Sequence, residues 1–345
     1  MRDETNGGTK SFDVLRSVTT RTMRLPFRLW GFGEAIALEG LLAASECLCD
    51  REPHGFVEAL IRATLASGIG SHPEDHLVPG MSILSLYRQT GDDDFLGGAR
   101  NLAAFYNSLP ENPYGAKLYR SGQPGWKNQI WVDQMNVGAP FLAALFALTG
   151  EEIYLRAATR ELLAHARLLQ DETSGLMWHG YESACGRNGE LWARGNGWAA
   201  MGMSQTLAWI PGPDPARTEI VERLTLLLRR LARLQDASGL WHTVVDDSTT
   251  PLETTLAAMI AYAIPAAQCR GLEVSEFEPM ASAACAAVLQ HISQDGALQL
   301  VSDATPIGTR RMYATRPFGV FPWGQGPLLL LLSMKEGGQN ENIQG

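Results

Sequence analysis

Asp133 is a carboxylate placed beside an aromatic side chain at the start of an apolar helix. It follows Trp131 by two residues, and the apolar run continues to Leu145. Burial beside an indole favours the neutral form of a carboxyl group, which can then donate a proton near neutral pH. An aspartate at this position is also a common helix N-cap. Asp133 is therefore a candidate general acid/base, with a capping role as the alternative.

A second candidate group surrounds an arginine in a glycine-rich segment. Arg194 lies between Trp192 and Trp198, and a Gly-Asn-Gly step follows it just before an apolar helix. Backbone amides at a helix N-terminus bind anions, and a guanidinium holds a carboxylate through paired hydrogen bonds. The segment therefore suits the carboxylate of an acidic sugar. The alternative is a glycine-rich turn with an arginine on the surface.

Further carboxylates stand in turns. Asp75 and His76 precede a Pro-Gly turn and a helix, and a hydrolase of the two-acid type needs a second carboxylate such as Asp75. Asp246, Asp247 and Glu253 are further candidates. Caps are the more common role for acidic residues in turns, and a cap is the expected role for these last three.

Tryptophan and histidine recur together in the predicted turns. The chain has nine tryptophans in 345 residues, and the pair Trp178 and His179 has a counterpart in Trp241 and His242. Aromatic rings near loop tips, together with polar groups, are typical of sugar-binding pockets. Filling of the core is the alternative for any single tryptophan. The group as a whole favours a pocket.

Two repeated patterns indicate the elements that position these residues. Residues 84–96 match residues 142–155, where an apolar helical stretch ends in Thr-Gly and acidic residues follow. The glycine suits a helix C-cap, and the acidic residues suit the first turn of the next helix. Residues 168–180 resemble residues 233–243, with a helix end, a tight turn and a short apolar segment.

The repeats predict an all-α fold of antiparallel helix pairs, since segments such as 220–234 carry apolar residues at helical spacing. An open solenoid and a closed α/α toroid both fit this pattern. Turns that carry tryptophan and histidine favour the toroid. We expect one barrel over residues 21–335, with loose tails at residues 1–20 and 336–345.

Composition limits which binding partners and which cellular compartment are expected. The formal net charge is −9, so neither nucleic acid nor an anionic membrane surface is an expected partner. The N-terminus lacks the apolar stretch of a secretory signal, and no apolar run is long enough for a membrane span, so the expected location is cytoplasmic. Five irregularly spaced cysteines predict reduced, buried thiols. The histidine and cysteine spacings predict no metal site.

Four motifs give the sequence a family resemblance. They are EDHLVPG at residues 74–80, NQIWVD at 128–133, GLMWHGY at 175–181 and WARGNGW at 192–198. With these motifs in this order, the sequence resembles the unsaturated glucuronyl and rhamnogalacturonyl hydrolases of glycoside hydrolase families 88 and 105. The resemblance extends from about Trp30 to Leu332.

This resemblance implies an (α/α)6 barrel with one deep pocket and no metal or organic cofactor. Asp133 corresponds to the general acid/base of the family, and Asp75 to a second acidic position that supports the pocket. The substrate-binding positions that we assign on this basis are Trp30, His76, Trp131, His179, Trp192, Arg194 and Trp198. The implied substrate is an oligosaccharide with a 4,5-unsaturated uronic acid at its non-reducing end.

Two regions depart from the family pattern, namely residues 111–126 and the chain before Trp30. They leave the identity of the leaving sugar open. Other toroid enzymes are alternatives: an inverting glycosidase would use Asp75 and Asp133 as its two carboxylates, and a sugar epimerase would use paired bases such as His179 and His242. A helical repeat scaffold without enzymatic activity is the remaining alternative.

Overall fold

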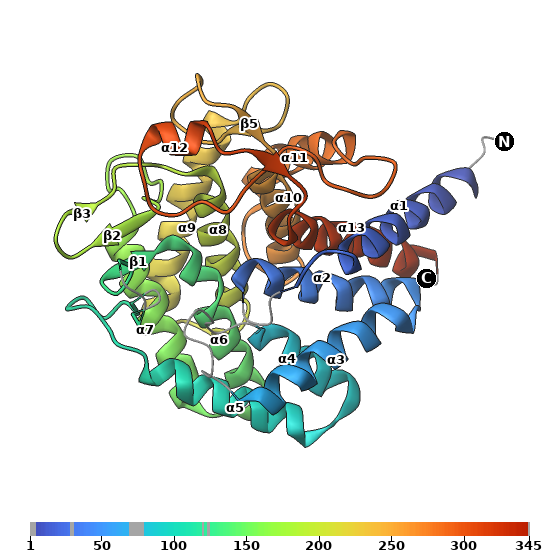
Figure 1. Cartoon of the computed structure of the whole chain (residues 1–345), viewed down its shortest axis with the longest axis horizontal. Helices are drawn as coiled ribbons and strands as arrows, with labels where there is room; N and C mark the ends of the chain where they lie inside the picture. Colours follow the sequence, from blue (N-terminus) through green and yellow to red (C-terminus); the bar gives the residue numbers. More distant parts are fainter. Residues whose placement is uncertain (1–4, 28–30, 69–78, 119–120, 123–124, 344–345) are drawn as a thin grey trace.

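An inner ring of six helices organises the computed structural model, which describes residues 5–27, 31–68, 79–118, 121–122 and 125–343 (Figure 1). Each inner helix contacts the next, and the last one closes the ring against the first. The inner helices are α2 (Phe32–Leu48), α4 (Gly80–Thr90), α6 (Gly138–Thr149), α8 (Ala193–Leu207), α10 (Thr255–Gln268) and α13 (Pro322–Ile343).

An outer helix accompanies each inner one. In Figure 1 the C-terminal helix α13 lies beside α1 and α2, so the two ends of the chain complete the last pair. The outer helices are α1 (Thr5–Met23), α3 (Arg51–Ser67), α5 (Asp93–Ser108), α7 (Glu152–Leu169), α9 (Pro215–Leu234) and α11 (Glu278–Gln290). The expected all-α (α/α)6 barrel is therefore confirmed.

The inner and outer helices differ in how much of their surface is buried. Every residue of α8 is buried, whereas α9 buries only one face, through Leu224, Leu227, Leu228 and Leu231. A helix that packs on all sides needs small and apolar residues around its whole circumference, while an outer helix needs one apolar stripe. The repeats also have the expected caps, because Gly91 and Gly150 end α4 and α6 in the left-handed conformation.

Short strands mark the end of the ring at which the inner helices begin. Each small sheet lies in connections that lead from an outer helix to the next inner one, and residues 129–131 pair with residues 180–182 across two such connections. The strands are β1 (Gln129–Trp131), β2 (Gly180–Glu182), β3 (Gly186–Arg187), β4 (Trp241–His242), β5 (Leu252–Glu253), β6 (Val301–Ser302) and β7 (Phe318–Gly319). The long connections, with most of the predicted functional residues, therefore gather at one end.

Three expectations need correction. The described part of residues 1–20 is not a loose tail, because helix α1 begins at Thr5 and buries Leu15 and Val18. The expected tail from residue 336 also starts inside a helix, and Glu336 is fully buried. The cysteines are free thiols as expected, but they are exposed or partly exposed rather than buried. No helix within the described part of the chain is long and apolar enough to cross a membrane.

Candidate active site

Asp133 lies in the 3-10 helix η1 (Val132–Asn136), between strand β1 and helix α6. Its side chain is 1% exposed, and neither carboxylate oxygen has a hydrogen-bond partner among the described residues. The true N-caps of this chain, such as Asp50, Asp92 and Asp214, accept backbone N–H groups. Asp133 is therefore not a cap. A buried carboxyl group without partners is costly, so its position calls for a functional explanation.

His179 faces this carboxyl group from the connection between α7 and α8. Its Nε2 lies 3.6 Å from Oδ2 of Asp133, and the ring is fully buried. Burial lowers the pKa of His179, and the positive charge of Arg194 lowers it further, although the neighbouring Asp133 acts in the opposite direction. The imidazole is therefore neutral near neutral pH.

Indole rings enclose the pair. The ring of Trp192 lies 4.3 Å from that of His179, and the ring of Trp131 meets His179 edge-on at 5.1 Å. Trp126 stacks on Trp131 at 5.0 Å. The structure thus brings Asp133, His179, Trp131 and Trp192 together.

Other predicted residues have different positions. Trp198 packs into a buried cluster with Trp192, Met201 and Met259. Trp241 also belongs to the core and donates from Nε1 to a main-chain carbonyl. Core packing, the alternative considered above, therefore holds for these two tryptophans. The remaining predicted positions, Trp30, Asp75 and His76, lie outside the described residues.

Arg194 is neither a surface side chain nor a free anion receptor. It lies in the first turn of α8 and is 2% exposed. Its guanidinium donates four hydrogen bonds, to the carbonyl and hydroxyl oxygens of Ser302, the carbonyl oxygen of Asp303 and the hydroxyl of Thr305. Burial lowers its pKa to about 10, so it stays charged at neutral pH. The side chain fastens the connection before α13 to α8, which corrects the expectation that it grips a substrate carboxylate.

Glu253 completes this buried charge arrangement. Glu253 lies in strand β5, which pairs with β4, and its side chain is fully buried. One of its carboxylate oxygens lies 3.8 Å from the guanidinium of Arg194. One carboxylate oxygen accepts a hydrogen bond of 2.6 Å from the hydroxyl of Ser302. Burial raises the pKa of Glu253, while Arg194 and Ser302 oppose that rise. The sequence indicated a cap here, and the structure shows an ion-pair partner for Arg194.

The remaining residues of the WARGNGW motif position the loop of His179 and the helix of Asp133. The amide of Asn196 is fully buried and bonds both the N–H and the C=O of Met177, two residues before His179. At Gly195 a β-carbon would lie 2.6 Å from Val132, next to Asp133. Gly195 is part of helix α8 and does not form a turn. Its lack of a side chain instead permits close packing of α8 on η1.

Gly202, two helical turns after Gly195 on α8, makes a closer approach still. A β-carbon there would lie 2.1 Å from the carbonyl oxygen of Met135, in the segment that carries Asp133. We expect Gly202→Ala to lower the free energy of unfolding by about 1–3 kcal/mol through overpacking, measured by urea denaturation. Gly97→Ala on α5 is the matched control, since nothing lies near its β-carbon position, and it should stabilise by about 0.5–1 kcal/mol. Equal effects at both sites would contradict this account.

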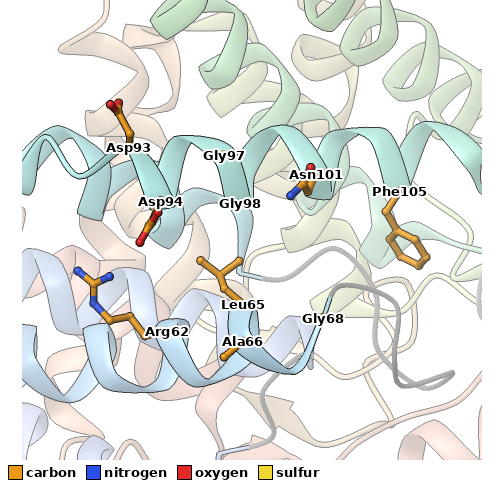
Figure 2. Close-up of a pocket in the computed structure, with 10 residues that line it drawn as sticks. All are labelled: Arg62, Leu65, Ala66, Gly68, Asp93, Asp94, Gly97, Gly98, Asn101 and Phe105. Carbon is orange, nitrogen blue, oxygen red and sulfur yellow. The ribbon is translucent and has the colours of Figure 1, made fainter.

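A cavity of about 790 Å³ lies elsewhere on the ring (Figure 2). It is a groove between α3 and α5, with Arg62 and Leu65 on one side and Asp94, Asn101 and Phe105 on the other. The guanidinium of Arg62 already pairs with carboxylates of Glu58 and Asp92. The groove holds no buried acid or base comparable to Asp133 and His179, so it is not the candidate active site.

Two residues near His179 were not found from the sequence. Tyr313 lies in helix α12 (Arg310–Ala314), and its hydroxyl is 2.5 Å from Nδ1 of His179. Asn188 donates to the same hydroxyl. Neither residue stands in a recognisable motif, and 134 residues separate Tyr313 from its partner, so no local pattern could have indicated the contact.

Comparison with known proteins identifies the family. The Glycosyl Hydrolase Family 88 profile matches residues 14–335. The unsaturated rhamnogalacturonyl hydrolase YesR of Bacillus subtilis is 27% identical over 331 residues, which cover 94% of each chain.

Solved structures share the fold. A possible member of family 105 from Salmonella enterica superposes with a TM-score of 0.87 at 23% identity, covering 98% of this chain and 97% of that one. The unsaturated glucuronyl hydrolase of Bacillus sp. GL1 superposes with a TM-score of 0.76 at 13% identity, covering 96% and 97% of the two chains. With a family match over nearly its whole length and the same ring of helices, the chain is a glycosidase that belongs to glycosyl hydrolase family 88.

Proposed function

We propose that the protein removes a 4,5-unsaturated uronic acid from the non-reducing end of oligosaccharides produced by a polysaccharide lyase. The observation that carries the proposal is the buried carboxyl group of Asp133, which has no partner in the described structure and faces Nε2 of His179 at 3.6 Å. Such a group can hold a proton in an apolar site and deliver it to a substrate atom. Its indole neighbours suit the flat ring of an unsaturated sugar.

The reaction then needs only one acid/base. Asp133 protonates C4 of the C4=C5 double bond, and positive charge develops at C5 and the ring oxygen. The resulting carboxylate takes a proton from water, whose oxygen adds to C5. The hemiketal opens as the bond between C5 and the ring oxygen breaks, and C1 releases the remaining saccharide as an alcohol. One water molecule is consumed, and no covalent intermediate with the protein is required.

His179 and Trp192 provide polar contacts for the same site. Nε2 of His179 and Nε1 of Trp192 are buried nitrogen atoms without hydrogen-bond partners in the described structure. A neutral imidazole can donate a hydrogen bond to an oxygen without placing a positive charge beside Asp133. We infer that Nε1 of Trp192 holds an oxygen atom of the substrate, whereas Nε2 of His179 faces Asp133. Arg194 does not take this role, because its guanidinium is already bonded.

The test is loss of the ultraviolet absorbance of the conjugated uronate. The purified protein is incubated with lyase digests of rhamnogalacturonan, of pectic homogalacturonan and of glycosaminoglycans, and fully saturated oligosaccharides serve as the control. We expect loss of absorbance on at least one digest, with rhamnogalacturonan fragments first because the relative YesR is named for that substrate. Release of sugar from saturated substrates without any change in absorbance would support an inverting glycosidase instead and overturn the proposal.

A further inference from the structure

A connection late in the chain crosses the candidate site. Helix α12 lies above strands β2 and β3 in Figure 1, and its Tyr313 contacts Asn188, the residue after β3, although more than a hundred residues separate them. It brings Tyr313, which is 1% exposed, against the buried ring of His179. The hydroxyl of Tyr313 and Nδ1 of His179 are 2.5 Å apart, within hydrogen-bonding distance.

The direction of this hydrogen bond depends on the orientation of one amide. Asn188 accepts from the main-chain N–H of Gly180 at its Oδ1 and donates from Nδ2 to the carbonyl of Gly308. These two main-chain partners fix which end of the amide is oxygen and which is nitrogen. Nδ2 of Asn188 therefore also donates to the Tyr313 hydroxyl, at 3.0 Å.

The Tyr313 oxygen thus receives two donors. The second is the main-chain N–H of Gly308, at 3.2 Å. A hydroxyl accepts two hydrogen bonds and donates one, so the remaining contact, to His179, must use its own proton. Burial raises the pKa of Tyr313, which keeps that proton in place. Nδ1 of His179 is then an acceptor, and the proton of the neutral ring lies on Nε2.

We propose that Tyr313 is a positioning residue that holds His179 in the tautomer with its proton on Nε2, directed at Asp133. The proposal rests on the proposed function only for its catalytic consequence. When Asp133 has given up its proton, an N–H group faces the new carboxylate and stabilises it. The other tautomer would place a nitrogen lone pair against the negative charge. The hydrogen bond at one ring nitrogen thus determines what the other nitrogen offers.

Nitrogen-15 NMR of histidine-labelled protein measures the tautomer directly. Long-range proton–nitrogen correlations distinguish a protonated from an unprotonated ring nitrogen, and His179→Gln identifies the signals of His179. In the unmodified protein we expect Nδ1 without a proton and Nε2 with one. In Tyr313→Phe we expect signals of the other tautomer to appear. Tyr262→Phe, a half-buried tyrosine that lines a separate cavity, should leave the spectrum of His179 unchanged.

Kinetics provide the second readout. Tyr313→Phe should lower kcat about 10- to 100-fold with little change in KM, whereas Tyr262→Phe should lower neither. A proton on Nδ1 of His179 in the unmodified protein would by itself overturn the proposal. This measurement needs no variant, so it decides the question even if Tyr313→Phe does not fold. Unchanged kcat in a folded Tyr313→Phe protein also overturns it. Because the spectra need no substrate, inactivity on every unsaturated digest would refute the proposed function and leave the tautomer result standing.

Discussion

Replacing Asp133 with asparagine is expected to lower kcat on an unsaturated oligosaccharide about 10²- to 10⁴-fold, the usual contribution of a general acid/base. Asparagine keeps the shape of the side chain but cannot deliver a proton to carbon. KM should change little, because Trp192 and the ring of His179 stay in place around the substrate. Initial rates from the absorbance assay, taken over a range of substrate concentrations, separate the two parameters.

The same variant should not be less stable than the parent protein. The carboxyl group of Asp133 is buried without a hydrogen-bond partner in the described structure, so replacing it with an uncharged amide of the same shape breaks no hydrogen bond. We therefore expect Asp133→Asn to leave the free energy of unfolding close to that of the parent protein while it removes activity. Asp93→Asn, at an exposed aspartate of α5, is the control and should alter neither. Retained activity together with a loss of stability in Asp133→Asn would show that the carboxylate is structural.

The sequence alone could predict some parts of this site and of the fold that carries it. Asp133 and His179 were found because each lies in a short motif beside tryptophan. The ring of helices was found because residues 84–96 and 142–155 repeat the same helix end, which the cap glycines Gly91 and Gly150 confirm. Signals of this kind are local in the chain, since caps, turns and apolar stripes depend on neighbouring residues.

The contacts that support the site could not be found in this way. Arg194 reaches Ser302 and Thr305 across more than a hundred residues. An arginine near a helix start has the same local sequence whether it binds a substrate or a distant loop. What separates the two roles is the position of other main-chain carbonyls, and only the folded ring determines that. The burial of Glu253 beside Arg194 could not be predicted from the sequence for the same reason.

Replacing Arg194 with methionine tests this structural role, and it should lower the free energy of unfolding by about 3–5 kcal/mol. The change leaves Glu253 buried without its cationic partner and removes four hydrogen bonds to the connection before α13. Arg229→Met is the matched control. Its ion pair with Glu276 is more than half exposed on both sides, and exposed pairs of this kind contribute about 0–1 kcal/mol. Urea denaturation of both variants measures the difference.

The double variant Arg194→Met/Glu253→Gln identifies the source of the loss. If an unpaired Glu253 carboxylate causes much of it, then removing that charge should restore part of the stability, and the two substitutions should not be additive. A role in gripping the substrate predicts a different result. In that case Arg194→Met would raise KM while the free energy of unfolding stayed near that of the parent protein.

The loss of stability in Arg194→Met should also depend on pH, and the burial of Glu253 determines in which direction. Burial raises the pKa of Glu253 in the folded protein, and Arg194 is the principal group that opposes the rise. Without Arg194 the folded protein should bind this proton still more tightly than the unfolded chain does. The unfolded chain loses the proton near the ordinary glutamate pKa, so the folded state is penalised as pH rises from there through the higher folded pKa. The instability of Arg194→Met should therefore grow with rising pH and shrink on acidification, whereas a loss that is the same at all pH values would assign the effect to the hydrogen bonds alone.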